Sequence, residues 1–518
     1  MNPSRKYMIP QKQAALAPLP SENRKSTTFG ADILTIAGGT IFAQMLTAIT
    51  APFLARIYGP DAFGMLALFT SLVTTIAIVA CLKYELSIML PRSDRDAANL
   101  LGVSLTSAII ISIFTLPLLK LLQDPLLQRL KATELEPYLW LVAPAVFVSG
   151  AFVALNYWNS RNRQYRRLSI ARIISSMATV GVQLGAGLAG YAYGGSLIAA
   201  SIVGSGASAL ILGAQIWRDD GSMIKESLDP KEMAAEAARY KKFPLLDSWS
   251  SLLNVISWQL PTFLLSAFFS TSVVGYYALG MNVLQLPMSL IGSAIGQVFF
   301  QRAAEAKSDG TLARIVEDTF LRLSVVGIFP ILLLASIGRE LFTVVFGPAW
   351  AEAGTFVQIL ALWIFFVFIT SPICALFSVL ERQGTFLIFN ACLFVARAAA
   401  LAVGGLSGDP RIALGIFSAV GVVAWAGLCI WLLREAGVSV RGIPKRVGRY
   451  LVYSLPVLCL GVLPWYRLGV DVMQVVIAGV LSAVIYYALA LRDDRGLQLP
   501  IRRKIKRIGA LILWVIKI

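Results

Sequence analysis

The sequence contains no histidine in its 518 residues. Histidine is the commonest general acid–base side chain near neutral pH and the commonest metal ligand. Its absence excludes histidine-based acid–base catalysis, histidine metal centres and phosphotransfer through histidine. These are much of the repertoire of membrane enzymes, so we expect neither enzymatic activity nor a cofactor.

Charge is also scarce. Only 14% of the residues are charged, against about 25% in a soluble domain, while 57% are hydrophobic and the mean hydropathy is +0.73. Apolar runs of about 20 residues recur along the chain, and each can cross about 30 Å of hydrocarbon as a helix. The composition therefore predicts an all-α, polytopic membrane protein.

Cysteines are few and lie apart within apolar runs: Cys81, Cys374, Cys392, Cys429 and Cys459. No Cys-x-x-Cys pair occurs, so we predict neither a disulfide framework nor a metal site. The first apolar segment begins near Gly30, behind a polar stretch with five basic residues. A signal peptide has a shorter basic region, so this segment is predicted to remain as a helix.

Apolar runs predict about fourteen transmembrane helices. They cover approximately residues 31–55, 63–90, 97–122, 137–159, 170–192, 195–217, 244–269, 275–300, 318–338, 352–380, 384–404, 411–433, 448–465 and 470–491. We group them as a cytoplasmic tail (1–30), a first six-helix lobe (31–217), a linker (218–243), a second six-helix lobe (244–433), two extra helices (448–491) and a basic tail (492–518).

The distribution of lysine and arginine supports this count. With both termini in the cytoplasm of a bacterial cell, 37 of the 45 basic residues fall on the cytoplasmic side of the inner membrane. The densest cluster, RNRQYRRLSIAR (161–172), could be a nucleic-acid arm in a soluble protein. Apolar spans flank it here, so we interpret it as a topology signal and predict no nucleic-acid partner.

Two segments resemble each other. FLARIYGPDAFGMLAL (53–68) and FLLSAFFSTSVVGYYAL (263–279) share an initial FL, a turn-rich gap and a final G-x-x-A-L. Six predicted helices separate them, so both run in the same direction across the membrane. This spacing favours two lobes in a parallel pseudo-repeat.

Arg397 is the sharpest single feature because it lies about thirteen residues into an apolar span. A charge at that depth is expensive, and such residues usually face a cavity or a partner on a transport path. The alternative is an arginine near one end that extends its head group to the interface. We favour the cavity.

Lys83 and Glu85 interrupt the second span, whose apolar run resumes through Leu90. On a continuous helix, residues two positions apart do not face each other. Each would then need another partner or water at the inner mouth. The alternative is an interfacial pair that only sets depth.

Further charges lie near span ends. The candidate cations for a cavity entrance are Arg56, Arg172, Arg302 and Arg322, and the candidate coupling or gating carboxylates, beside Glu85, are Asp61 and Asp247. Terminal arginines are more often topological anchors, and the alternative for Asp247 is a cap at the start of its helix. The basic tail is predicted to lie as an amphipathic helix on anionic lipids.

Four stretches resemble the Wzx-type oligosaccharide flippases of the MATE-like multidrug/oligosaccharidyl-lipid/polysaccharide exporter superfamily. They are ARIYGPDAFGMLAL (55–68), KYELSIMLPRSDRDAANL (83–100), NYWNSRNRQYRRLSIAR (156–172) and LFTVVFGPAWAEAG (341–354). The resemblance covers about residues 30–490. It implies two six-helix lobes around a central cavity, two extra helices, and transport of undecaprenyl-pyrophosphate-linked sugars across the inner membrane.

The expected function is therefore flipping of a lipid-linked oligosaccharide through a cationic cavity by alternating access, with polymerase and other polysaccharide assembly proteins as partners. No carboxylate stands clearly at mid-membrane depth, which disfavours cation coupling. A peptidoglycan lipid precursor flippase and a cation-coupled multidrug exporter remain alternatives. A polysaccharide polymerase or O-antigen ligase is disfavoured, because the predicted loops are short and histidine is absent.

Overall fold

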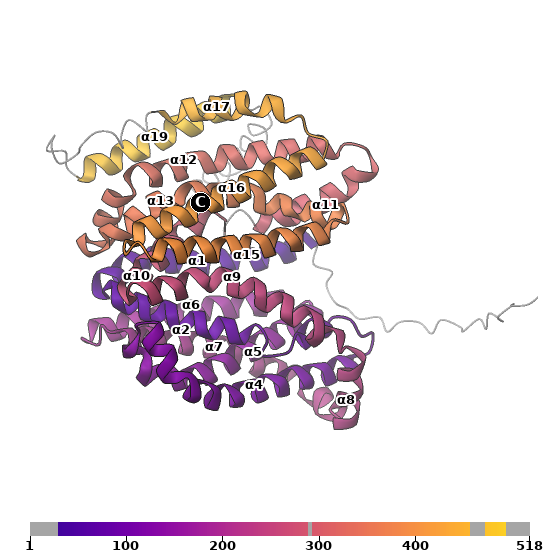
Figure 1. Cartoon of the computed structure of the whole chain (residues 1–518). Coiled ribbons are helices and arrows are strands. Elements are labelled where there is room, and N and C mark those ends of the chain that lie inside the picture. The colour runs from indigo at the N-terminus through magenta and orange to yellow at the C-terminus, as the bar shows by residue number, and fades with distance from the viewer. Residues whose placement is uncertain (1–28, 289–292, 456–471, 494–518) are drawn as a thin grey trace, which may run out of the picture.

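A computed structural model describes residues 29–288, 293–455 and 472–493 of the chain. These residues form helices and turns, with no strand among them. The helices gather into two bundles, one drawn in indigo to magenta and the other in red to orange, and α9 and α10 lie where the bundles meet (Figure 1).

The first bundle contains α1 (Phe29–Ile57), α2 (Pro60–Ala77), α3 (Tyr84–Ser87), α4 (Asp94–Arg129), η1 (Thr133–Leu141), α5 (Val142–Arg161), α6 (Tyr165–Leu188) and α7 (Gly194–Ser227). A linker helix, α8 (Pro230–Arg239), and a π-helical turn, η2 (Phe243–Asp247), follow.

The second bundle contains α9 (Ser248–Phe268), α10 (Thr271–Pro287), α11 (Ser293–Ser308), α12 (Leu312–Phe346), η4 (Pro348–Trp350), α13 (Ala351–Thr370), η5 (Ser371–Ala375), α14 (Leu376–Val379), α15 (Gln383–Gly405) and α16 (Pro410–Glu435). Beyond it come η6 (Val440–Gly442), α17 (Ile443–Tyr453) and α19 (Val472–Asp493), and α17 and α19 pack on α12.

Eleven helical segments in the described ranges are long and apolar enough to cross a membrane. They match eleven of the fourteen predicted spans. The eighth span is divided between α10 and α11, the thirteenth lies mostly outside the described residues, and α19, at the fourteenth, is not among the eleven. The tails at 1–28 and 494–518 also lie outside them.

Polar residues cap the N-termini of α4, α8 and α16. Ser93, Asp229 and Asp409 are N-caps whose side chains accept a hydrogen bond from the backbone two residues later. Pro230 and Pro410 follow directly, at the first helical position, where a missing N–H costs nothing.

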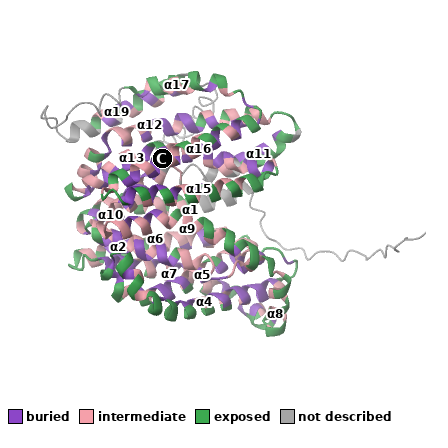
Figure 2. Ribbon diagram, in the orientation of Figure 1, coloured by how far each residue is buried: buried purple, intermediate pink, exposed green. Residues whose placement is uncertain are grey.

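The outer sides of the helices are largely exposed (Figure 2), and on α4 this side carries large apolar residues such as Ile113 and Phe114. Such a face suits lipid.

The boundary between the bundles has two distinct ends. We call the end with the α1–α2 and α9–α10 turns the turn end, and the end with α8 the linker end. At the turn end α2 crosses α10 at Gly64 and Gly275, where a Cβ on Gly64 would lie 1.9 Å from the Thr271 carbonyl oxygen. A Cβ on Gly275 would lie 1.9 Å from the carbonyl oxygen of Pro60. The two glycines are the G of G-x-x-A-L in both copies of the repeat.

Candidate functional site

Arg397 lies in α15 inside the second bundle, and only 2% of it is exposed. Three aromatic rings surround its guanidinium carbon, at 5.3 Å for Trp258, 5.1 Å for Trp363 and 5.7 Å for Phe417. These rings come from α9, α13 and α16, and we call the three residues the aromatic box. Arg397 therefore lies behind a wall of rings rather than on an open cavity surface.

The guanidinium has unmet hydrogen-bonding capacity. Its Nε and Nη2 are buried without a hydrogen-bond partner among the described residues. No described carboxylate pairs with it either. Each aromatic face attracts a desolvated cation by about 2 kcal/mol or more, which offsets part of the several kcal/mol of hydration that a buried ion loses. The rings supply no oxygen acceptor for the guanidinium N–H groups. An anion with oxygen acceptors would satisfy both the charge and the free N–H groups.

Sequence reasoning found Arg397 but missed the aromatic box. A signal was present, because tryptophan in membrane proteins concentrates at the interfaces, while Trp258 and Trp363 stand in the middle of their spans.

The box borders the boundary between the bundles. Trp258 is 36% exposed, whereas Trp363 and Phe417 are buried. The next residue, Gln259, accepts a hydrogen bond through Oε1 from the Ser71 hydroxyl of α2 at 3.1 Å. Helix α9 thus contacts Arg397 on one side and the first bundle on the other.

Lys83 and Glu85 depart from the prediction. The end predicted for the helix over 63–90 is wrong, because α2 ends at Ala77 and turns follow up to Lys83. Lys83 has left-handed backbone geometry with φ of 63°. Lys83 Nζ therefore reaches Glu85 Oε1 at 3.7 Å, although the two could not meet on a continuous helix. Glu85 is buried, and its Oε2 has no described partner.

Arg56 and Asp61 lie at the turn end and join the two bundles. Arg56 Nη2 donates to the Val344 carbonyl of α12 at 2.6 Å. The Ser272 hydroxyl of α10 donates to Asp61 Oδ1. Both residues are exposed, so their polar contacts rim this boundary rather than line a buried chamber.

The remaining candidates are dispersed. Arg172 Nη1 donates to the Thr40 hydroxyl, which joins α6 to α1 within the first bundle. Arg302 and Arg322 are exposed on α11 and α12. Asp247 is exposed and makes no side-chain cap, so the capping alternative is wrong. No hydrogen bond or ion pair between described residues joins any of these four to Arg397.

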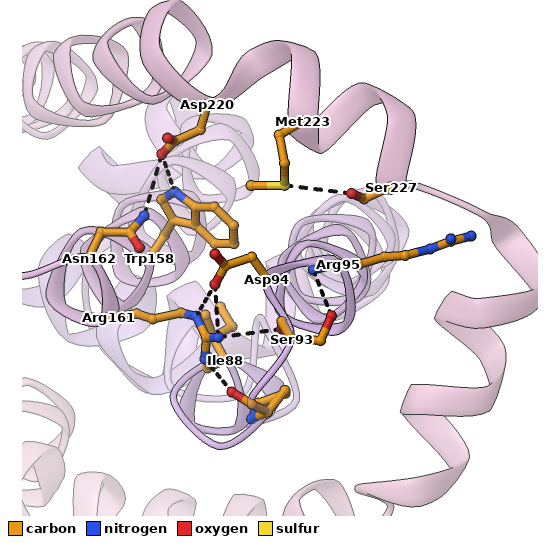
Figure 3. Close-up of polar contacts among 11 residues, drawn as sticks. Ile88, Ser93, Asp94, Arg95, Trp158, Arg161, Asn162, Asp220, Met223 and Ser227 are labelled. Atoms are coloured by element: carbon orange, nitrogen blue, oxygen red, sulfur yellow. Dashed lines mark hydrogen bonds and ion pairs between the residues drawn. The ribbon is translucent and has the colours of Figure 1, made fainter. Parts of the chain in front are cut away.

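The basic cluster at 161–172 has partners at the linker end of the first bundle. Arg161 contacts Asp94 at 3.0 Å and donates to the carbonyls of Ile88 and Pro91 at 3.1 Å and 2.7 Å. Figure 3 shows the Arg161 side chain beside Asp94 and Ile88. Nearby, the Trp158 indole donates to Asp220 at 2.9 Å. The α3–α4 turn, α5 and α7 are thereby tied together.

Solved structures of two membrane transporters share this fold. An inward closed conformation of the lipid II flippase MurJ superposes with a TM-score of 0.69 at 13% identity, covering 89% of this chain and 99% of that one. An inward-facing multidrug resistance MATE family transporter of the MOP superfamily gives 0.55 at 15% identity, covering 78% and 94%. The chain thus has the MATE-like transporter fold. No curated protein sequence matches it.

The family follows from sequence rather than from shape. A model of the polysaccharide biosynthesis protein family matches residues 53–355, which is more than half of the chain. The chain belongs to this family.

Proposed function

We propose that the protein flips undecaprenyl-pyrophosphate-linked oligosaccharide from the cytoplasmic to the periplasmic leaflet of a bacterial inner membrane. The observation that carries this proposal is Arg397, a buried cation with two guanidinium nitrogens that have no hydrogen-bond partner among the described residues. Membership of a polysaccharide biosynthesis family supports a sugar cargo, and the transporter fold supports movement across a membrane.

The depth of Arg397 suits a cargo that crosses the whole membrane. It lies eight residues before the last residue of α15, about 12 Å along the helix. A pyrophosphate passing between leaflets must leave water at this depth, where its charge is costliest. A guanidinium offers it permanent charge and paired N–H donors in a planar fork.

The membrane potential can supply drive. Moving an anion from the negative cytoplasmic side outward is favoured by about 2.3 kcal/mol per charge per 100 mV. Transport would then need no dedicated ion site.

The two ends of the boundary receive roles in this proposal. Basic residues gather at the linker end, which we assign to the cytoplasm, and the turn end then faces the periplasm. Asp61 with Ser272 would latch the periplasmic side, and Lys83, Arg172, Arg302 and Arg322 would attract the cargo on the other. Glu85 would keep the Lys83 ammonium in place through their ion pair. Asp247, at the start of α9, would move with that helix.

The test is delivery of isotope-labelled undecaprenyl-pyrophosphate oligosaccharide to the outer face of proteoliposomes at a defined potential. Arg397→Ala should lower delivery by about tenfold to a hundredfold, because a hydrogen bond to a charged group contributes about 1.5–3 kcal/mol. Arg397→Lys should retain part of it. Arg314→Ala, which removes an exposed arginine of α12, is the control. Normal, potential-independent delivery by Arg397→Ala would refute the proposal.

A peptidoglycan lipid precursor is the alternative cargo, favoured by the likeness to a lipid II flippase. Competition between the two lipids in the same vesicles separates these cargoes. Each lipid is added unlabelled while delivery of the other is measured. The lipid that inhibits at the lower concentration is the preferred cargo.

A further inference from the structure

Two neighbouring residues of α9 connect Arg397 to the first bundle. Trp258 places its ring over the guanidinium at 5.3 Å, and Gln259 accepts the hydrogen bond from Ser71 at 3.1 Å. Two consecutive residues therefore make one contact with the buried cation and one contact with the other bundle. A motion that parts α2 from α9 therefore breaks a contact one residue away from the ring that covers the cation.

The other two walls of the aromatic box are fixed. Trp363 and Phe417 pack edge to face, with ring centroids 4.9 Å apart. Gly421 leaves room for the Trp363 indole, since a Cβ there would lie 2.4 Å from that ring. Both residues are about 1% exposed. Close packing of this kind leaves no space for a ring to swing.

Trp258 has the freedom that the other two lack. Part of its ring is exposed, and Pro261 lies three residues later inside α9. Proline lacks an N–H, so the carbonyl of Ser257 has no helical partner, and α9 is weakened across the residues that carry Trp258.

We propose that Trp258 is a movable cover that withholds Arg397 from the space between the bundles while the Ser71–Gln259 contact holds. When α2 and α9 part, the indole moves aside and the guanidinium takes up a pyrophosphate-type anion. This inference rests on the proposed function, and it assigns Trp258 as a positioning residue. Separation of the bundles then favours exposure of the Arg397 guanidinium. By thermodynamic linkage, anion binding to the exposed guanidinium favours separation of the bundles to the same extent.

The cover can be tested without any cargo. Phenylglyoxal modifies accessible arginines, and peptide mass spectrometry of the full chain in vesicles reports each site. In the wild type, Arg397 should react far more slowly than exposed Arg314 in the same sample. Trp258→Ala should raise the Arg397 rate by at least about fivefold, because the competent population grows. Gln259→Leu should raise it less, by weakening the link.

Two variants separate a cover from a general loosening of α9. Trp258→Phe should keep Arg397 protected, because phenylalanine preserves an aromatic face. Trp249→Ala removes an exposed tryptophan of the same helix and should leave the rate unchanged. Melting temperatures of all variants check folding.

The outcomes divide cleanly. Equal labelling of Arg397 in the wild type and Trp258→Ala overturns the cover, and wild-type labelling in Gln259→Leu overturns the link to the first bundle. Neither result touches the delivery assay with Arg397→Ala, so failure of the cover and failure of the proposed function are read separately.

Discussion

The two ends of the boundary between the bundles are held in different ways. At the turn end, backbone meets backbone, because Gly64 and Gly275 leave no room for side chains between α2 and α10. The Trp350 indole also donates to the Ala55 carbonyl at 2.8 Å, and Lys131 Nζ to that of Phe268 at 2.8 Å. This end can open only if several close contacts break together.

At the linker end, side chains hold the linker to one bundle. The Asn99 side-chain amide donates to the Ser227 carbonyl at 3.0 Å and accepts from the Asp229 N–H at 3.1 Å. Arg95 forms two hydrogen bonds with Glu232, at 2.9 Å and 2.7 Å. Helix α8 is therefore attached to the first bundle through α4. The contrast is that the turn end joins the two bundles to each other, whereas the contacts of Asn99 and Arg95 join α8 to the first bundle.

Among the contacts at the two ends of the boundary, the crossing at the turn end is expected to have the largest effect. Gly64→Val puts a branched side chain where even a Cβ lies 1.9 Å from a backbone oxygen, so the bundles must separate there. We expect at least a tenfold loss of delivery, about 1.4 kcal/mol. Spin labels on Leu188→Cys and Leu406→Cys, in a background without the five native cysteines, should report a longer distance across the turn end.

Gly59→Val is the matched control, because a Cβ on Gly59 has nothing within 4 Å and its φ of −75° suits any residue. An unchanged distance distribution in Gly64→Val would show that the crossing tolerates a side chain. The turn end would then not be closed by backbone contact.

Much of this end was predictable from sequence. Gly64 and Gly275 occupy matching positions in the two G-x-x-A-L segments, so the repeat alone indicates that they have equivalent places in the two bundles. Eleven spans followed from apolar runs, because hydropathy averaged over a helix is insensitive to local detail.

The other features of the site depend on contacts between distant parts of the chain, which sequence patterns do not predict. The apolar run through Leu90 hid the turns before Lys83, because hydropathy does not distinguish an apolar turn from a helix. The aromatic box draws on α9, α13 and α16, and nothing local pairs Trp258 with Phe417. Asn99 and Asp229 are likewise distant in sequence. The predicted linker at 218–243 therefore began too early, because α7 continues to Ser227.

A smaller effect is expected at Asn99, where the linker end is held. Asn99→Leu removes a buried amide and leaves the Ser227 carbonyl and the Asp229 N–H without their partner, at a cost of about 1–3 kcal/mol. Local opening of α8 should rise, measured as faster proteolysis between 228 and 247. Asn254→Leu, at an exposed site on α9, is the control. Equal cleavage in both variants would mean that Asn99 does not hold α8.

The smallest effect is expected from Arg95→Ala, which removes the ion pair between Arg95 of α4 and Glu232 of α8. Both side chains are well exposed, so water and salt screen their attraction, and such pairs contribute about 0–1 kcal/mol. Proteolysis of 228–247 should rise only slightly in low salt and match the wild type in high salt, while Asn99→Leu stays fast at both. If Arg95→Ala releases α8 as strongly as Asn99→Leu, surface charge rather than the buried amide holds the linker. Salt would then control the release of α8, which the contacts at Asn99 do not predict.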